Sequence, residues 1–211
     1  MKITKFGHCC MVLDIDGVKI VTDPGNVTIA QNDLEGIDAI LITHEHGDHF
    51  HIGSVKAMLA KNPNATVITN ASVGALLEKE GISSVRVGDG EHTDFKGISI
   101  EGFGKEHAPV YEEAGSVENT AYLVANKFYF PGDNFYICGK EIEVLALPVA
   151  GTWMKMSEAI DFAKTVRAKK LFSVHDGMVT PPFRPFTNWL LQHFVPGTEY
   201  TVFTDGETKE F

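Results

Sequence analysis

The stretch LITHEHGDHFHIG, residues 41–53, places four of the chain's nine histidines within eight positions, directly behind a short apolar run. A protein core cannot bury so many imidazoles without partners, because each unpaired buried polar group costs free energy. A metal site can use them as ligands, since neutral imidazole is the commonest protein ligand for metal ions. The stretch therefore predicts a metal site that follows a buried strand.

The spacing inside this stretch suggests two pairs of ligands. His44 and His46 are two residues apart, so on an extended segment both side chains project to the same side. Gly47 lets the chain turn, and we expect Asp48 and His49 to begin the next helix. This reversal can present a second ligand pair close to the first.

Three further ligand candidates each follow a predicted strand. They are His107, Asp133 and His175. Functional side chains of α/β proteins gather where loops leave the strand ends, so we expect these three to approach the histidine-rich stretch.

The other histidines have different expected roles. His51 lies two residues beyond His49 on the expected helix and therefore points away from it. His92 precedes a strand and His193 lies inside an amphipathic helix, so we assign both to surface or packing roles. For His8 two alternatives stay open: it faces the site from the first hairpin, or it is a hydrogen-bonded structural histidine.

Strands outnumber helices along the chain, and the two types are mixed. The predicted strands are 2–6, 11–15, 18–22, 39–43, 66–69, 85–87, 93–103 with a turn at 96–97, 120–130 with a turn at 126–127, 144–149, 171–174 and 200–203. The predicted helices run from Asp48 to a stop at Asn62-Pro63, over 71–80, over 157–168 with Ser157 as N-cap, and over 186–194. Asp16-Gly17 predicts a tight hairpin. The simplest packing is an αββα sandwich, one α/β domain over residues 1–211.

Composition and charge narrow the class of protein. The chain has 211 residues, 44% apolar and 22% charged, as in an ordinary globular protein. No apolar run approaches the roughly 20 residues that span a bilayer, and we see no leader peptide, so we expect no membrane partner. Cys9, Cys10 and Cys138 are an odd count and no disulfide framework, which favours a cytoplasmic location. A net charge of -10 without a basic stripe argues against a nucleic-acid partner.

The motif His44-Glu45-His46-Gly47-Asp48-His49 resembles the H-x-H-x-D-H signature of the metallo-β-lactamase superfamily. The later His107, Gly132-Asp133 and His175 match that superfamily's remaining ligands in order. The resemblance covers nearly the whole chain and implies a four-layer αββα metallo-β-lactamase fold. It also implies two divalent metal ions, one held by His44, His46 and His107, the other by Asp48, His49 and His175, with Asp133 bridging. Zinc is the first expectation, with manganese or iron as alternatives.

Two regions are similar to one branch of that superfamily, the ascorbate-6-phosphate-lactonase-like hydrolases. Residues 7–10 (GHCC) and 21–24 (VTDP) resemble the branch's Gly-His-Ser/Ala opening and its Asp-Pro pair. Residues 147–151 (LPVAG) and the segment from 156 resemble its Leu-Pro-x-Gly-Gly and x-Met-x-x-x-Glu-Ala segments. Cysteines stand where serine is usual, and Ser-Val precedes His175, so the branch's substrate is not carried over.

We therefore expect a metal-dependent hydrolase that uses a metal-bound hydroxide on a small ester, lactone or phosphoester, with Asp48 transferring the proton. The alternatives are a phosphodiesterase or nuclease of the same fold, and a metal-binding protein without turnover. For Asp23 two roles stay open: it orients a ligand histidine, or it is a simple turn residue. Trp153 and Arg184 are pocket candidates, although a lone loop arginine is more often solvated. The substrate, the physiological metal and the formation of a homo-oligomer stay open.

Overall fold

The computed structural model describes all 211 residues and contains two seven-stranded sheets. The first sheet consists, in order across it, of β14 (Thr208–Glu210), β1 (Lys2–Gly7), β2 (Cys10–Ile15), β3 (Val18–Thr22), β4 (Ala39–Ile42), β5 (Thr66–Thr69) and β6 (Ser84–Arg86). The strands from β14 to β3 pair antiparallel, and those from β3 to β6 pair parallel. The carboxyl ends of these parallel strands therefore lie at the same end of the sheet.

The second sheet repeats this division. It consists, in order, of β13 (Glu199–Thr201), β12 (Lys170–Val174), β11 (Val144–Pro148), β10 (Phe128–Phe130), β9 (Ala121–Val124), β8 (Ile98–Phe103) and β7 (His92–Phe95). The strands β7 to β10 pair antiparallel, and β10 to β13 pair parallel.

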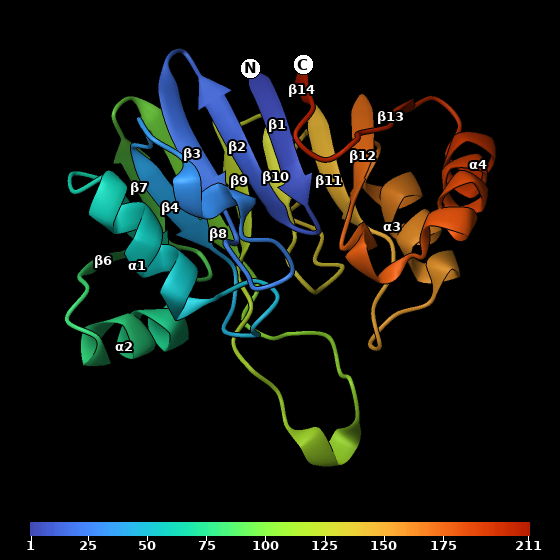
Figure 1. The fold of residues 1–211 in the computed structure, drawn as a ribbon. Coiled ribbons are helices and arrows are strands. Elements are labelled where there is room, and N and C mark those ends of the chain that lie inside the picture. The colour runs from blue at the N-terminus through green and yellow to red at the C-terminus, as the bar shows by residue number, and fades with distance from the viewer.

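Helices cover the outer faces of both sheets, which confirms the αββα architecture (Figure 1). α1 (Ile52–Lys61) and α2 (Ala71–Lys79) share a buried apolar cluster with the first sheet. α3 (Met156–Val166) and α4 (Arg184–Phe194) share another with the second sheet. Short 3-10 helices lie in the loops: η1 (Ala30–Asp33), η2 (Glu112–Ala114), η3 (Asp176–Met178) and η4 (Pro181–Phe183). None of the helices combines the length and apolar character needed to cross a membrane.

A third cluster, of 20 buried residues, fills the space between the two sheets. Met11, Tyr122 and Phe172 are among its large side chains. Cys9 joins this inner cluster, whereas Cys10 joins the outer cluster under α1 and α2. The two adjacent cysteines thus face opposite sides of the sheet and are both free, as expected from their sequence.

The turns follow from residues that accept positive φ. Asp16 and Gly17 have φ of 52° and 87°, which confirms the predicted hairpin. The turn between β9 and β10 places Ala125 and Asn126 at φ of 55° and 53°, one residue earlier than predicted.

Three predictions of local structure were wrong. α1 begins at Ile52, not at Asp48, because the ring of His51 accepts the backbone N–H of Ser54 and caps the helix there. Ser157 is not the N-cap of α3, because the Glu158 carboxylate accepts the N–H of Lys155 at 2.7 Å. β14 was missed, because a short polar strand at a sheet edge carries no apolar alternation to reveal it.

Candidate metal centre

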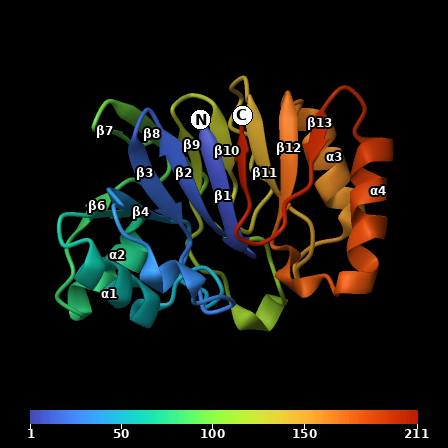
Figure 2. The same ribbon diagram turned by 45° about the horizontal axis from the view of Figure 1, so that its top comes forward.

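All seven ligand candidates lie in loops at one end of the sandwich. The histidine-rich stretch follows β4, and His107, Asp133 and His175 follow β8, β10 and β12. His8 sits in the β1–β2 turn and Asp23 follows β3. The loop between β8 and β9, which contains η2, projects beyond the strands at this end (Figure 1, Figure 2). Segments from both sheets therefore converge on one place, as strand-end loops do.

The stretch after β4 forms a tight turn ahead of α1. The backbone N–H groups of His49 and Phe50 both donate to the carbonyl of His46, at 2.9 and 2.7 Å. Asp48 and His49 thus belong to this turn and not to the helix. Gly25 packs against it so closely that an added Cβ would lie 1.8 Å from the carbonyl oxygen of Asp48. Only glycine allows the two loops to meet at this distance.

The first ligand group consists of His44, His46 and His107, whose candidate ligand atoms lie within 4.8 Å of one another. The hydroxyl of Thr43 donates to Asp23 at 2.7 Å, so its oxygen accepts the Nδ1–H of His44 at 3.0 Å. Nδ1 of His107 donates to the carbonyl of Ala108 at 2.5 Å. In both rings the proton is on Nδ1, and Nε2 keeps its lone pair for a metal.

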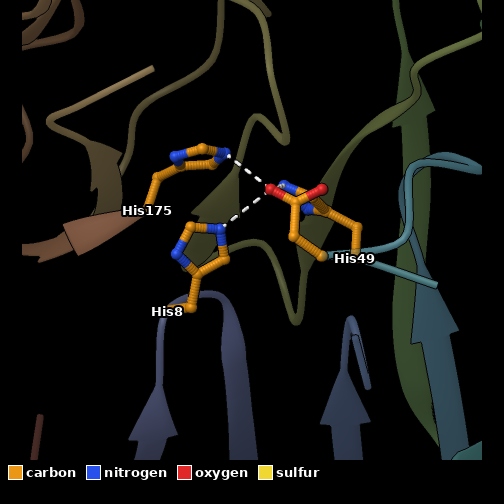
Figure 3. Close-up of side chains that lie close together, drawn as sticks. His8, His49 and His175 are labelled. Carbon is orange, nitrogen blue, oxygen red and sulfur yellow. Dashed lines mark hydrogen bonds and ion pairs between the residues drawn. The ribbon is translucent and has the colours of Figure 1, made fainter. Parts of the chain in front are cut away.

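The second ligand group consists of His8, Asp48, His49 and His175, again within 4.8 Å of one another. Nε2 of His8 lies 3.1 Å from Oδ2 of Asp48, and Nε2 of His175 lies 3.3 Å from the same oxygen. Figure 3 shows the rings of His8 and His175 turned toward this shared carboxylate oxygen. His8 therefore faces the site, which resolves the alternative that its sequence left open.

The Asp23 carboxylate contacts the ring of His49 on the side away from its Nε2. Its Oδ2 accepts Nδ1–H of His49 at 2.6 Å and the hydroxyl of Thr43 at 2.7 Å. Its Oδ1 accepts the backbone N–H of Thr43 at 2.8 Å. A carboxylate that holds Nδ1–H fixes the ring so that Nε2 points into the site and becomes a stronger ligand. Of the two roles considered for Asp23, the orienting one needs this contact with His49.

Asp133 lies between the two groups. Its Oδ1 is 3.1 Å from Nε2 of His49, and its Oδ2 is 3.3 Å from Nε2 of His107 and 3.1 Å from Nε2 of His175. The indole N–H of Trp153 donates to Oδ2 at 2.7 Å. Asp133 thus contacts histidines of both groups, and Trp153 holds its carboxylate in place.

Several atoms of the site are buried without a hydrogen-bond partner. They are Nε2 of His44, His49, His107 and His175, Nδ1 of His8 and His175, and Oδ1 of Asp133. Each such atom costs about 1–3 kcal/mol if it stays unsatisfied. A set of imidazole nitrogens and carboxylate oxygens, all converging on one volume, fits divalent cations such as zinc, manganese or iron.

Burial and neighbouring charges set the protonation of the group. Burial holds the pKa of His44 well below its usual range, so its ring is neutral at neutral pH. Burial alone would raise the pKa of the Asp48 and Asp133 carboxyls, but contacts with the histidines outweigh it and hold both pKa values well below the usual range. Both carboxylates are therefore ionised and available to a cation.

A cavity of about 340 Å³ opens beside the two groups. Asp48, Asp133, Trp153 and Met178 are among the residues that line it. Arg184 does not line it. Because η4 leads directly into α4, Arg184 begins that helix, where its Nε donates to the carbonyl of Val179 at 3.4 Å beside a different cavity.

Two supporting residues escaped the sequence analysis. Thr43 joins Asp23 to His44, and its place directly before the motif was an available signal. Asn119 accepts the backbone N–H of Asp133 at 3.0 Å and donates to the carbonyl of Pro131 at 3.0 Å. Nothing in the sequence around Asn119 marks it, because its role depends on a loop from the neighbouring strand.

The two-sheet fold and the converging ligand groups agree with comparisons with known proteins. Residues 2–175 match the family model of the beta-lactamase superfamily domain. Protein Rv0786c of Mycobacterium tuberculosis is 32% identical over 189 residues, which cover 87% of this chain and 88% of that protein. A UPF0173 metal-dependent hydrolase of Exiguobacterium is 28% identical over 194 residues, 83% of this chain and 85% of the relative.

A solved structure shares the fold. The metallo hydrolase Igni18 of Ignicoccus hospitalis superposes with a TM-score of 0.78 at 20% identity, covering 100% of this chain and 98% of that one. The chain therefore belongs to the beta-lactamase superfamily.

Proposed function

We propose that the chain binds two divalent cations and hydrolyses a small ester, lactone or phosphoester. The observation that carries this proposal is the position of Asp133, whose carboxylate contacts histidines of both ligand groups. One carboxylate between two converging sets of donors is the arrangement that a bridged pair of cations needs.

Each ligand group would hold one cation. His44, His46 and His107 would hold the first, and Asp48, His49 and His175 the second, with Asp133 between them. Zinc suits this donor set, as do manganese and iron. Bound divalent cations activate water at neutral pH and polarise the oxygen of the scissile group, so no serine or cysteine nucleophile is needed.

Asp48 is the residue placed to move a proton. Its side chain is 30% exposed and lines the cavity, whereas that of Asp133 is 4% exposed. His8 and His175 hold Oδ2 of Asp48 from two sides and so set the direction of its carboxylate. Asp48 can accept a proton from the attacking water and pass it to the leaving oxygen, which is general base and then general acid catalysis.

Metal analysis tests the proposal directly. Protein purified without chelator and saturated with zinc should hold close to two ions per chain, and His107→Ala and His175→Ala should each lower that number toward one. His51→Ala is the matched control, because His51 caps α1 and belongs to neither group. Saturation of the unchanged protein at one ion per chain would contradict a dinuclear site.

A further inference from the structure

The wall of the cavity beside the ligand groups is apolar in part. Six of its 14 lining residues are hydrophobic: Ala108, Val110, Ala114, Val117, Trp153 and Met178. Most of these come from the loop between β8 and β9, and Met178 comes from η3. Apart from the candidate ligands, the rest of the wall is glycine, serine and threonine, with no lysine or arginine. The wall offers a bound molecule apolar contact and hydroxyl groups but no fixed positive charge.

The same loop carries negative charge beside the cavity. Residues 106–118 include four glutamates and no lysine or arginine. Glu112 and Glu113 are exposed and directly precede Ala114, which lines the cavity. A bound anion next to this loop would meet like charges, which weaken binding and slow association.

Three cationic side chains of neighbouring segments do not line the cavity. Lys5 is 1% exposed and pairs with Asp176 at 2.7 Å. Arg184 lines other cavities and not this one. Lys105, at the start of the loop, lies 3.8 Å from Asp89. The cavity therefore has no spare cation for a phosphate or carboxylate outside the reacting group.

We infer that the substrate is a small ester or lactone that carries no anionic group outside the reacting bond and has an uncharged, apolar acyl or alkoxy portion. This inference rests on the proposed function and narrows its substrate class. The reacting carbonyl is directed to the ligand groups, and the apolar remainder lies against Val110, Val117 and Met178. A cavity of about 340 Å³ suits a small molecule.

Hydrolysis of such a substrate moves one proton from water to the leaving oxygen. The oxygen of water bonds to the acyl carbon, the bond from that carbon to the alkoxy oxygen breaks, and Asp48 passes a proton from the water to the alkoxy oxygen. The products are an alcohol and a carboxylic acid, which ionises at neutral pH.

A matched substrate pair tests the inference on the metal-loaded enzyme. Para-nitrophenyl pentanoate and the mono-para-nitrophenyl ester of glutaric acid share a leaving group and acyl length, and differ by one carboxylate. We expect kcat/KM for the neutral ester to be at least about tenfold higher, since the carboxylate of the other ester must leave water for a wall without a cationic partner and beside an acidic loop. Equal rates, or faster cleavage of the anionic ester, would overturn the inference while the proposed hydrolase function stands, and so would cleavage of para-nitrophenyl phosphate with neither ester cleaved. Cleavage of none of them would overturn the proposed function and this inference with it.

Two variants test whether the charge of the cavity wall causes the preference for the neutral ester. Ala114→Lys adds a cation to the cavity wall, and Ala60→Lys adds the same charge to the exposed surface of α1. Ala114→Lys should narrow the preference for the neutral ester by at least about threefold, mainly through KM of the anionic ester, because the charge acts at short range. Ala60→Lys should leave the preference unchanged. The same preference in both variants would show that the charge of this wall does not select the substrate.

Discussion

The two ligand groups of the site are built in different ways. The first is made of three imidazoles, two of them from one six-residue motif, and the Nδ1 atoms of His44 and His107 donate to an uncharged hydroxyl and a carbonyl. The second includes the Asp48 carboxylate, and its His49 donates to a second carboxylate, that of Asp23.

The two groups also differ in how many separate segments of the chain supply their residues. The first group needs only one loop, that of His107, to complete the motif. The second assembles side chains from the β1–β2 turn, the turn after β4 and the loop after β12. It also concentrates negative charge. We therefore expect the second group to depend more strongly on buried carboxylates and on the packing of distant segments.

The largest expected effect comes from the residue that joins the two groups. Asp133→Asn keeps the shape but removes the negative charge and one strong oxygen donor. We expect the fold to persist, occupancy of at least one metal to fall, and hydrolysis to decrease by at least about 10²-fold, because electrostatic support for the transition state is lost. Circular dichroism, elemental analysis and turnover measure the three outcomes.

Asp94→Asn is the control for this substitution. Asp94 is exposed and accepts the N–H of Gly97 at 2.9 Å, which the amide oxygen of asparagine can also do. Its metal content and turnover should match those of the unchanged protein. Normal metal content and turnover in Asp133→Asn would mean that the two groups are not joined by this residue.

A smaller effect is expected at Asp23, whose carboxylate contacts His49 of the second group directly and reaches His44 of the first group only through Thr43. Asp23 accepts three hydrogen bonds, from Thr43 and His49, and an asparagine amide would turn its NH₂ toward one of these donors. We expect Asp23→Asn to weaken binding of one metal by about 10–100-fold and to leave the other bound. Metal titration followed by calorimetry would resolve the two steps.

Asp38→Asn is the matched control, because Asp38 also accepts a backbone N–H, that of Lys19 at 2.9 Å, far from the ligand groups. Its two binding steps should be unchanged. If Asp23→Asn weakened both steps equally, Asp23 would support the groups jointly and the contrast between them would fail.

The smallest effect is expected at the histidine of the opening stretch that belongs to neither group. His51→Ala should lower the free energy of unfolding by about 0.5–1 kcal/mol through loss of the α1 cap, with metal content and turnover unchanged. His51→Asn should restore the stability, since asparagine is a good N-cap. Chemical denaturation measures both variants, and loss of metal in His51→Ala would place His51 among the ligands.

The main elements of the fold could be predicted because each carries its own pattern. Apolar runs marked β4 and β11, and Asp16-Gly17 marked a hairpin. The starts of α1 and α3 could not be predicted well, since the caps are chosen among several neighbouring polar side chains. β14 pairs with β1 from the far end of the chain, and no local pattern reports such pairing.

The site was predictable to a similar degree. The motif after β4 and the strand-end positions of Asp133 and His175 marked the candidates, and superfamily membership is confirmed. The likeness to the ascorbate-6-phosphate-lactonase branch, the number of metals and the absence of a nucleic-acid partner stay predictions. The position of Arg184 could not be predicted from its sequence neighbours. Arg184 follows the candidate ligand His175 by nine residues, but it begins α4 and lies beside another cavity.

By itself, the sequence determined the chemistry of the ligands and the order of most strands and helices, because residue type and periodicity act locally. Only the tertiary structure decided that His8 meets Asp48, that Asn119 holds Asp133 and that the cavity has no cationic wall. These features depend on distances between segments far apart in the chain. Such distances are set by the packing of two sheets and not by any one of their strands.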